Sequence, residues 1–256
     1  MGVRLTILGS GTSHGVPMIG CECAVCMSDD PHDHRTRCSA AFTFNDHTLL
    51  IDTAPELRLQ CLANDIRVAH GVAYTHHHAD HVVGLDDVRR FNWLLQAAFP
   101  VYAEAPTMTR LRQMFEYAFV NDPTYPSAKP ELDPRLLDGP FAFAGRDVIP
   151  IRIMHGPLPV VGFRVGAVAY LPDCNQIPSG SRAALADLDA LVLDALRIRP
   201  HPTHFNLEQA VETAEQIGAA RTYFTHIAHE LGHAATNASL PTGMQLAYDG
   251  LRIESD

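Results

Sequence analysis

The sequence predicts a single α/β domain, residues 1–256, built mainly on two β-sheets. Short apolar runs rich in β-branched and aromatic residues alternate with helical patterns along the chain. Two pairs of such runs, at residues 40–52 and 161–173, are joined by short turns, as expected for hairpins in a sheet. With 46% hydrophobic residues, the chain has enough apolar side chains for one sizeable core.

The predicted elements follow from the period of the apolar residues. Strands are expected at residues 4–9, 40–45, 48–52, 71–76, 100–103, 148–154, 161–166, 167–173, 190–195 and 221–226. Helices are expected at residues 55–64, 83–98, 107–119, 181–188 and 206–217, the last with Asn206 as its N-cap. Residues 121–140 contain several prolines and are predicted to form a long surface loop. We interpret residues 105–140 as an insertion whose proline-rich part covers the site as a lid.

The composition argues against several classes of function. A formal net charge of −10 is unfavourable for a protein that coats nucleic acid or a membrane surface. A small anionic substrate remains compatible, because a metal ion can supply local positive charge. No apolar run approaches the ~20 residues that span a bilayer, and residues 1–9 lack a signal-peptide pattern. A cytoplasmic location is therefore expected, where clustered cysteines are more often metal ligands than disulfides.

Histidines give the strongest evidence of chemistry, since the chain has 15 and several cluster. Residues 75–81, T-H-H-H-A-D-H, directly follow an apolar run. Alternation along an extended chain places His76 and His78 on one side, and Asp80 and His81 follow at the turn. Burying these groups without partners would be costly. They therefore indicate a metal site, and imidazole with carboxylate suits Zn, Mn or Fe.

Three more ligand-type side chains, His155, Asp173 and His226, stand where other apolar runs end. Each alone would usually be structural. Together with residues 75–81 they indicate a shared site at one rim of the sheets. Such a set suits two metal ions with one bridging carboxylate. A pair of metal ions can hold a bridging hydroxide that acts as the attacking group.

The pattern T-H-x-H-x-D-H after a strand, followed by His, Asp and His at later strand ends, resembles the metallo-β-lactamase fold superfamily of hydrolases. The resemblance covers nearly the whole chain. It implies an αββα sandwich, two mixed sheets flanked by helices, with the metals at the sheet edge. It also implies that one ion is held by His76, His78 and His155 and the other by Asp80, His81 and His226, with Asp173 bridging the two.

A cysteine cluster indicates a second metal site. Cys21, Cys23 and Cys26 have C-x-C-x-x-C spacing. Three close thiolates indicate a structural Zn²⁺ site, which requires a fourth ligand. This cluster, the run G-S-G-T-S-H-G-V-P before it and T-H-I-A-H at residues 225–229 together resemble the cyclic phosphodiesterases of the carbon–phosphorus lyase pathway, which open 5-phosphoribosyl 1,2-cyclic phosphate. The resemblance implies that His229 is the fourth zinc ligand and that His204 is a catalytic residue, with His201 as its close competitor.

The expected function is that of a dinuclear metal-dependent phosphodiesterase that hydrolyses a small, cyclic phosphate ester. Metal-bridging hydroxide would attack phosphorus, and His204 would protonate or orient the leaving oxygen. Asp80 is a candidate catalytic residue as well as a ligand. The expected cofactors are two divalent ions, Mn or Zn with Fe left open, and one structural Zn. The expected partner is the phosphate-ester substrate, not nucleic acid or a membrane, and a homodimer is left open.

Two alternatives stay open. The first is another hydrolase on the same fold, either ribonuclease Z-like or acting on thioesters or lactones. Such a ribonuclease uses a basic arm to hold tRNA, but residues 105–139 contain more acidic than basic side chains. The second is a non-catalytic accessory protein like that of pyrroloquinoline quinone biosynthesis, which shares a similar cysteine cluster. Against it, every expected metal-ligand position is filled here.

Residues 229–233, H-E-L-G-H, also match the zinc-protease pattern, in which two histidines lie one helical turn apart. Gly232 disfavours a helix there by ~1 kcal/mol relative to Ala, and no later histidine could supply a third ligand. We therefore interpret the match as a coincidence. No role is assigned to Glu230, His233, His201, Cys38, Cys61 or Cys174, and the last is expected to be a small buried residue.

Overall fold

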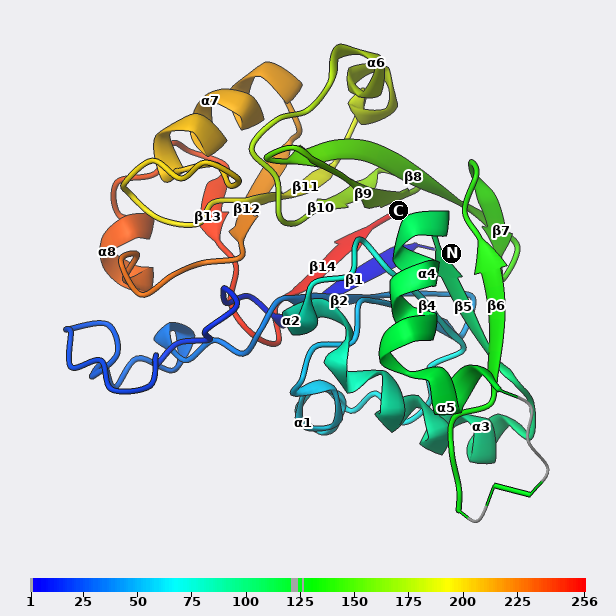
Figure 1. The fold of residues 1–256 in the computed structure, drawn as a ribbon. Helices are drawn as coiled ribbons and strands as arrows, with labels where there is room; N and C mark the ends of the chain where they lie inside the picture. Colours follow the sequence, from blue (N-terminus) through cyan, green and yellow to red (C-terminus); the bar gives the residue numbers. More distant parts are fainter. Residues whose placement is uncertain (1, 121–123, 126) are drawn as a thin grey trace.

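The computed structural model describes residues 2–120, 124–125 and 127–256. Two seven-stranded sheets pack face to face, and helices cover both outer faces (Figure 1). In Figure 1, α1, α3 and α5 lie on one side of the sandwich and α6 and α7 on the other. The predicted αββα architecture is therefore confirmed. Within the described residues, no helix is long and apolar enough to cross a membrane.

The first sheet has the order β14-β1-β2-β3-β4-β5-β6. It is antiparallel from β14 to β3 and parallel from β3 to β6. Its strands are β1 (Val3–Gly9), β2 (Ser39–Phe44), β3 (His47–Ile51), β4 (Gly71–Ala73), β5 (Phe99–Ala103), β6 (Leu132–Leu136) and β14 (Arg252–Ser255). Its outer face packs against α1 (Leu57–Ala63), α2 (Ala79–Val82), η2 (Val83–Val88), α3 (Arg89–Leu95), α4 (Ala105–Met114) and α5 (Glu116–Phe119).

The second sheet has the order β13-β12-β11-β10-β9-β8-β7. It is parallel from β13 to β10 and antiparallel from β10 to β7. Its strands are β7 (Phe141–Phe143), β8 (Arg146–His155), β9 (Leu158–Val165), β10 (Val168–Leu171), β11 (Ala190–Asp194), β12 (Arg221–Thr225) and β13 (Met244–Leu246). The remaining helices are η1 (Pro31–Asp33), α6 (Ser179–Arg182), η3 (Ala183–Leu185), α7 (Leu207–Ile217) and α8 (His233–Asn237).

The side-chain period of the strands explains why their sequences are continuous apolar runs. In β2, Ala40, Phe42 and Phe44 enter the core between the sheets, whereas Ala41 enters the core beneath the helices. A strand buried on both faces needs apolar residues at every position.

The directions of the strands determine where the site lies. Strands β8, β10, β11 and β12 run the same way, so their C-terminal ends meet at one edge.

The predicted long loop at residues 121–140 is wrong in part, because Leu132–Leu136 forms β6 and pairs with β5. This edge strand is half-buried to exposed and contains a proline, so it lacks the apolar run on which the prediction relied. The lid interpretation includes residues 121–123 and 126, which lie outside the described residues. Nearby, Lys129 Nζ donates to the Tyr117 carbonyl at 2.9 Å and Glu131 N to Asn92 Oδ1 at 3.0 Å. These contacts are to α5 and α3, and the lid role stays a prediction.

Helix α7 begins with the predicted N-cap. Asn206 Oδ1 accepts a hydrogen bond from Gln209 N at 2.9 Å, and Gln209 Oε1 accepts one from Asn206 N at 3.2 Å. We expect Asn206→Ala to lower the free energy of unfolding by about 1 kcal/mol, measured by urea denaturation. Glu215→Ala, at an exposed position of the same helix, is the control. Equal effects of the two substitutions would contradict the role of the cap.

Candidate active site

The structure brings the predicted histidine and aspartate ligands together at one edge of the sandwich, in two groups. One group is His76, His78 and His155, and the other is Asp80, His81, Asp173 and His226. Within each group, the potential ligand atoms all lie within 4.8 Å of one another. This is the division that the family resemblance implied.

Asp173 lies between the two groups. Its Oδ1 is 3.2 Å from His81 Nε2, and its Oδ2 is 3.2 Å from His226 Nε2 and 3.9 Å from His76 Nε2. Burial raises the pKa of this carboxyl, but His226 and His81 outweigh burial and hold it well below its usual range. The carboxylate is therefore the ionised group that contacts both sets of imidazoles, as a bridging ligand requires.

Turns after the strands aim these side chains at the shared edge. His155 is the last residue of β8, and Asp173 and His226 follow β10 and β12. Both Asp173 (φ 46°) and His226 (φ 59°) have left-handed backbone conformations. Such a residue costs of order 1–3 kcal/mol and persists only where its surroundings hold it, often at functional sites. His78 is the N-cap residue of α2, whose short helix presents Asp80 and His81.

The unpaired atoms in this cluster fit a metal site. Among the described residues, the Nε2 atoms of His76, His81 and His226 and the Oδ1 atom of Asp173 are buried and have no hydrogen-bond partner. Leaving buried polar atoms unsatisfied costs of order 1–3 kcal/mol each. Divalent ions bound in place of the ring protons would satisfy these atoms, and nitrogen with carboxylate oxygen is a suitable donor set for Zn, Mn or Fe.

Asp52, which the sequence interpretation missed, contacts the second group through the His81 ring nitrogen that does not face the other ligands. It is fully buried, its Oδ2 lies 2.7 Å from His81 Nδ1, and it accepts hydrogen bonds from Thr75 N and Thr75 Oγ1, both at 2.8 Å. Burial opposes a charged His81, but Asp173 and Asp52 raise the pKa of its imidazole well above the usual value. A carboxylate on the remote ring nitrogen fixes the orientation of a metal-binding histidine.

His204, the residue for which the family resemblance implied a catalytic role, lies against both groups. Its ring is 4.5 Å from that of His155 and 4.6 Å from that of His226, between centroids. Its Nδ1 lies 2.7 Å from Oδ2 of Asp194, which also accepts a hydrogen bond from Cys174 N at 2.7 Å. Asp194, at the end of β11, is a second carboxylate that the sequence interpretation missed. Burial raises the pKa of Asp194 and lowers that of His204.

A pocket of about 270 Å³ opens beside His204. Among the described residues, its ionisable lining side chains are His14, Arg197, Arg199, His201, His204, His229 and Glu230. Arg199 Nη2 pairs with Glu230 at 2.6 Å. Arg197 donates to the carbonyls of Arg199 and Pro200, at 3.2 and 2.9 Å. Since Arg199 is paired with Glu230 and burial lowers the pKa of His201, Arg197 is the main positive charge of this pocket next to the candidate catalytic histidine.

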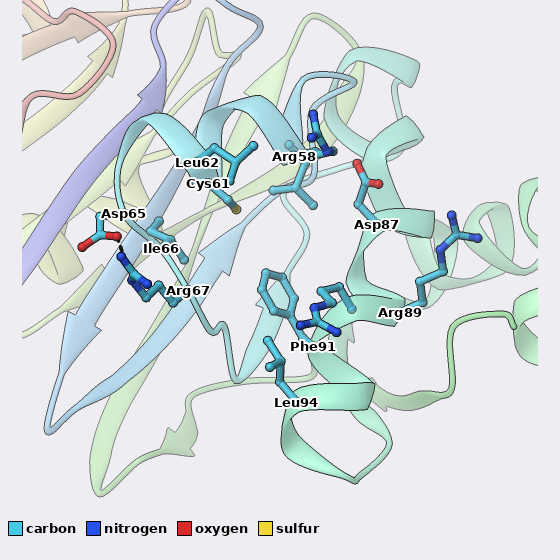
Figure 2. Close-up of a pocket in the computed structure, with 12 residues that line it drawn as sticks. Arg58, Cys61, Leu62, Asp65, Ile66, Arg67, Asp87, Arg89, Phe91 and Leu94 are labelled. Atoms are coloured by element: carbon cyan, nitrogen blue, oxygen red, sulfur yellow. Dashed lines mark hydrogen bonds and ion pairs between the residues drawn. The ribbon is translucent and has the colours of Figure 1, made fainter.

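A larger cavity, of about 790 Å³, lies between α1 and α3 (Figure 2). Leu57 and Phe91 are buried in its floor, and Arg58, Asp87 and Arg89 are among its charged residues. Burial raises the pKa of Cys61 there to about 12, so this thiol stays protonated. None of the residues that line this cavity belongs to the ligand groups described above.

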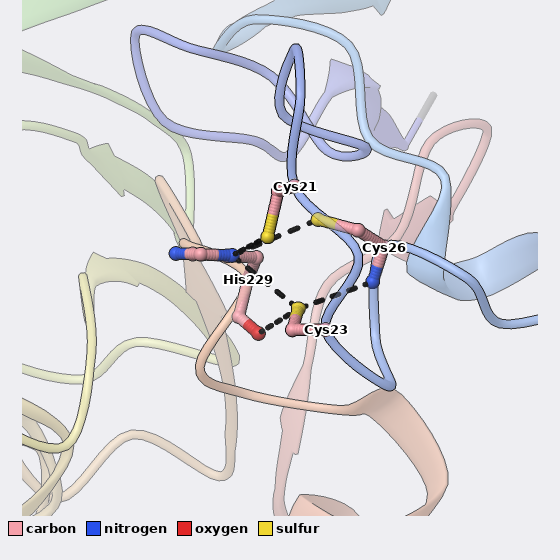
Figure 3. Close-up of side chains that lie close together, drawn as sticks. All are labelled: Cys21, Cys23, Cys26 and His229. Atoms are coloured by element: carbon pink, nitrogen blue, oxygen red, sulfur yellow. Dashed lines mark hydrogen bonds between the residues drawn. The ribbon is translucent and has the colours of Figure 1, made fainter.

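The cysteine cluster meets the predicted histidine. Figure 3 shows the sulfur atoms of Cys21, Cys23 and Cys26 around His229, with distances to its Nδ1 of 3.1, 3.4 and 3.6 Å. The Cys26 backbone N–H lowers the pKa of Cys23 to about 6, whereas burial raises that of Cys26 to about 11. Three sulfurs and one imidazole nitrogen make a closed set suited to a structural zinc ion. Cys38 and Cys174 are buried elsewhere.

The H-E-L-G-H segment is a turn rather than a helix. Helix α8 begins only at His233, with Gly232 as its N-cap residue. His229 and His233 therefore do not share a helical face, which supports rejecting the protease interpretation. Glu230 pairs with Arg199 at the pocket beside His204.

A family model decides the class of the chain. The model of the beta-lactamase superfamily domain matches residues 47–227, a stretch that includes every candidate ligand of the two catalytic groups. The chain belongs to the beta-lactamase superfamily. The fold and the histidine pattern agree with this assignment, so the family-level prediction is confirmed.

Two solved structures have folds similar to this one. A crystal structure described as a new diphosphatase from the PhnP family is 44% identical with a TM-score of 0.93, covering 100% of this chain and 98% of that one. Zn²⁺-bound PqqB from Methylobacterium extorquens is 21% identical with a TM-score of 0.80, covering 98% and 99%. At that identity the second likeness shows the fold alone.

A curated relative is longer than this superfamily member. A Porphyromonas gingivalis protein named octanoyltransferase is 40% identical over 261 residues, which cover 99% of this chain and 52% of that protein. The chain thus spans about half the length of this relative.

Proposed function

We propose that this superfamily hydrolase is a dinuclear metal-dependent phosphodiesterase acting on a small, cyclic phosphate ester. The observation that carries the proposal is the pair of ligand groups joined by Asp173, with His204 and a pocket lined by Arg197 directly beside them. Two bound divalent ions would supply an activated water and positive charge for the phosphoryl oxygens.

The ligands and their partners would divide the work as follows. His76, His78 and His155 would hold one ion, and Asp80, His81 and His226 the other, with Asp173 shared. Asp52 and Thr75 would keep the His81 ring in place through their hydrogen bonds. The cysteine cluster with His229 would hold a structural zinc ion.

His204 would deliver a proton to the leaving oxygen. Its Nδ1 is occupied by Asp194, so Nε2 is the ring nitrogen left for substrate. The buried Asp194 carboxyl group on the other nitrogen fixes the orientation of this histidine. Arg197 would attract the anionic substrate to the pocket next to it.

The names of the relatives bear on the substrate in different ways. The diphosphatase in the PhnP family supports hydrolysis of a P–O bond. The name octanoyltransferase belongs to a protein of which this chain matches only about half. The name therefore assigns no acyl-transfer activity to this chain.

A panel of substrates tests the proposal. Cyclic phosphodiesters, linear phosphodiesters and diphosphates would be compared with Mn²⁺ and with Zn²⁺, and we expect the highest kcat/KM for a cyclic diester. Preference for a diphosphate would keep phosphoryl chemistry but replace the proposed substrate. Turnover only of thioesters or lactones, with no phosphodiester cleaved, would overturn the proposal.

A further inference from the structure

Arg35 is a buried arginine that the proposed function does not use. It is 2% exposed, and burial of a guanidinium is costly unless the group is paired. Its Nη2 donates to Asp33 Oδ1 at 2.9 Å and to the Leu231 carbonyl at 2.8 Å. Its Nη1 donates to the Ala228 carbonyl at 3.3 Å, and its Nε to the His32 carbonyl at 3.1 Å.

Two of these acceptors belong to the turn at residues 228–231, which carries His229. Asp33, the ionic partner of Arg35, also accepts a hydrogen bond from His233 N at 2.8 Å. The H-E-L-G-H segment therefore wraps around a buried Arg35–Asp33 pair. The segment does not form the helix that a zinc-protease motif requires. Its backbone conformation is instead fixed by these hydrogen bonds to Arg35 and Asp33.

The backbone of Arg35 holds the other half of the cysteine site. Arg35 N donates to the Val16 carbonyl at 2.7 Å, and Val16 N donates to the Arg35 carbonyl at 2.8 Å. This pair closes the loop that carries Cys21, Cys23 and Cys26. One residue thus fixes the base of the cysteine loop with its main chain and the His229 turn with its side chain.

The same turn continues directly into the catalytic groups. His226, three residues before His229, has a left-handed backbone conformation. Between them, Ile227 N donates to the Ser10 carbonyl and Ala228 N to the Leu196 carbonyl, both at 2.8 Å. Only two residues separate His226 from His229, so a shift of Ala228 that strains these two hydrogen bonds would also move His226.

We propose that Arg35 is a positioning residue for both metal sites. Its guanidinium fixes the turn at residues 228–231, so that His229 completes the cysteine cluster and His226 keeps its place in the second ligand group. The planar guanidinium reaches three carbonyls and one carboxylate at once, whereas a lysine ammonium offers donors from a single atom. Only the effect on turnover rests on the proposed function.

Arg35→Lys tests this role, because it keeps the positive charge beside Asp33 but removes the several N–H donors of the planar guanidinium. Affinity for Zn²⁺ at the cysteine site would be measured by competition with a chromophoric chelator, and the geometry by the thiolate-to-cobalt absorption of the Co²⁺-loaded chain. We expect about tenfold weaker zinc affinity or more, the range for losing a partner behind a metal ligand, and a reduced cobalt band. Hydrogen exchange of the Ile227 and Ala228 amides should be at least about tenfold faster.

Arg221→Lys is the matched control. Arg221 lies on β12, the strand that leads to His226, and also pairs with a carboxylate and a carbonyl, Asp189 at 2.7 Å and Glu254 at 2.8 Å. We expect it to change none of these readouts. Should Arg35→Lys fail to fold, Asp33→Asn should loosen the same turn and give the same changes to a smaller degree.

The proposal would be overturned if folded Arg35→Lys kept the zinc affinity, cobalt absorption and amide exchange rates of the wild type, even if its Tm were lower. For turnover, a fall in kcat is expected because His226 would move, and KM should rise as well, because Ala228, His229 and Glu230 of the same turn line the pocket beside His204. If the wild type cleaves no phosphodiester, the proposed function fails, but the zinc, cobalt and exchange measurements still decide the role of Arg35.

Discussion

His78→Ala is expected to reduce kcat/KM for bis(p-nitrophenyl) phosphate by more than about 100-fold, since even removing a partner behind a metal ligand costs 10–100-fold. His78 is exposed at the rim and is a member of the first ligand group, so its loss should disable the site without unfolding the chain. Steady-state kinetics, circular dichroism and metal analysis of the same preparation would check this. The variant should bind one catalytic ion fewer or bind it more weakly.

His47→Ala is the matched control for that experiment. His47 is an exposed histidine at the start of β3, outside every ligand group of the described chain, and its removal should leave kcat/KM within about twofold. Asp173→Asn should be at least as damaging as His78→Ala, because Asp173 contacts both groups. Near wild-type turnover in either ligand variant would show that the reaction occurs elsewhere.

His204→Ala is expected to lower kcat by about 10²- to 10⁴-fold for an ester with a poor leaving group, the range for a lost general acid. The effect should be much smaller for bis(p-nitrophenyl) phosphate, because p-nitrophenolate leaves without a proton. Measuring kcat for both substrates separates proton delivery from positioning. Asp194→Asn should show the same dependence on the leaving group with a smaller loss, since Asp194 positions the His204 ring.

An equal loss on both substrates would contradict the acid role and indicate that His204 holds a metal ion or the phosphoryl group instead. Metal analysis distinguishes these outcomes. His204 offers a ligand atom within 4.8 Å of those of His155 and Asp173, so a structural role at the metals would lower the bound metal as well as kcat.

Much of the candidate site could be predicted from sequence because its side chains stand at the ends of strands. His155, Asp173 and His226 directly follow strong apolar runs, and those strands run in one direction. Local pattern and sheet geometry therefore bring them together without knowledge of long-range packing. The cysteine cluster is similarly local, apart from His229.

Other features depend on contacts that no local pattern reveals. Asp52 and Asp194 also end apolar strands, but only the structure shows that they hold His81 and His204. The Arg35 contacts join residues almost 200 positions apart. Edge strands β6 and β14 are partly exposed and lack the continuous apolar run of a central strand, so periodicity did not find them.

The most direct test is to strip the chain of all metal with a chelator and restore it with known equivalents of Mn²⁺ or Zn²⁺, following bound metal and phosphodiester turnover together. The two ligand groups and the cysteine cluster predict three ions per chain at saturation. Turnover should be absent without metal and should rise only as both catalytic groups are filled. Turnover that persists in the metal-free chain would contradict the dinuclear site.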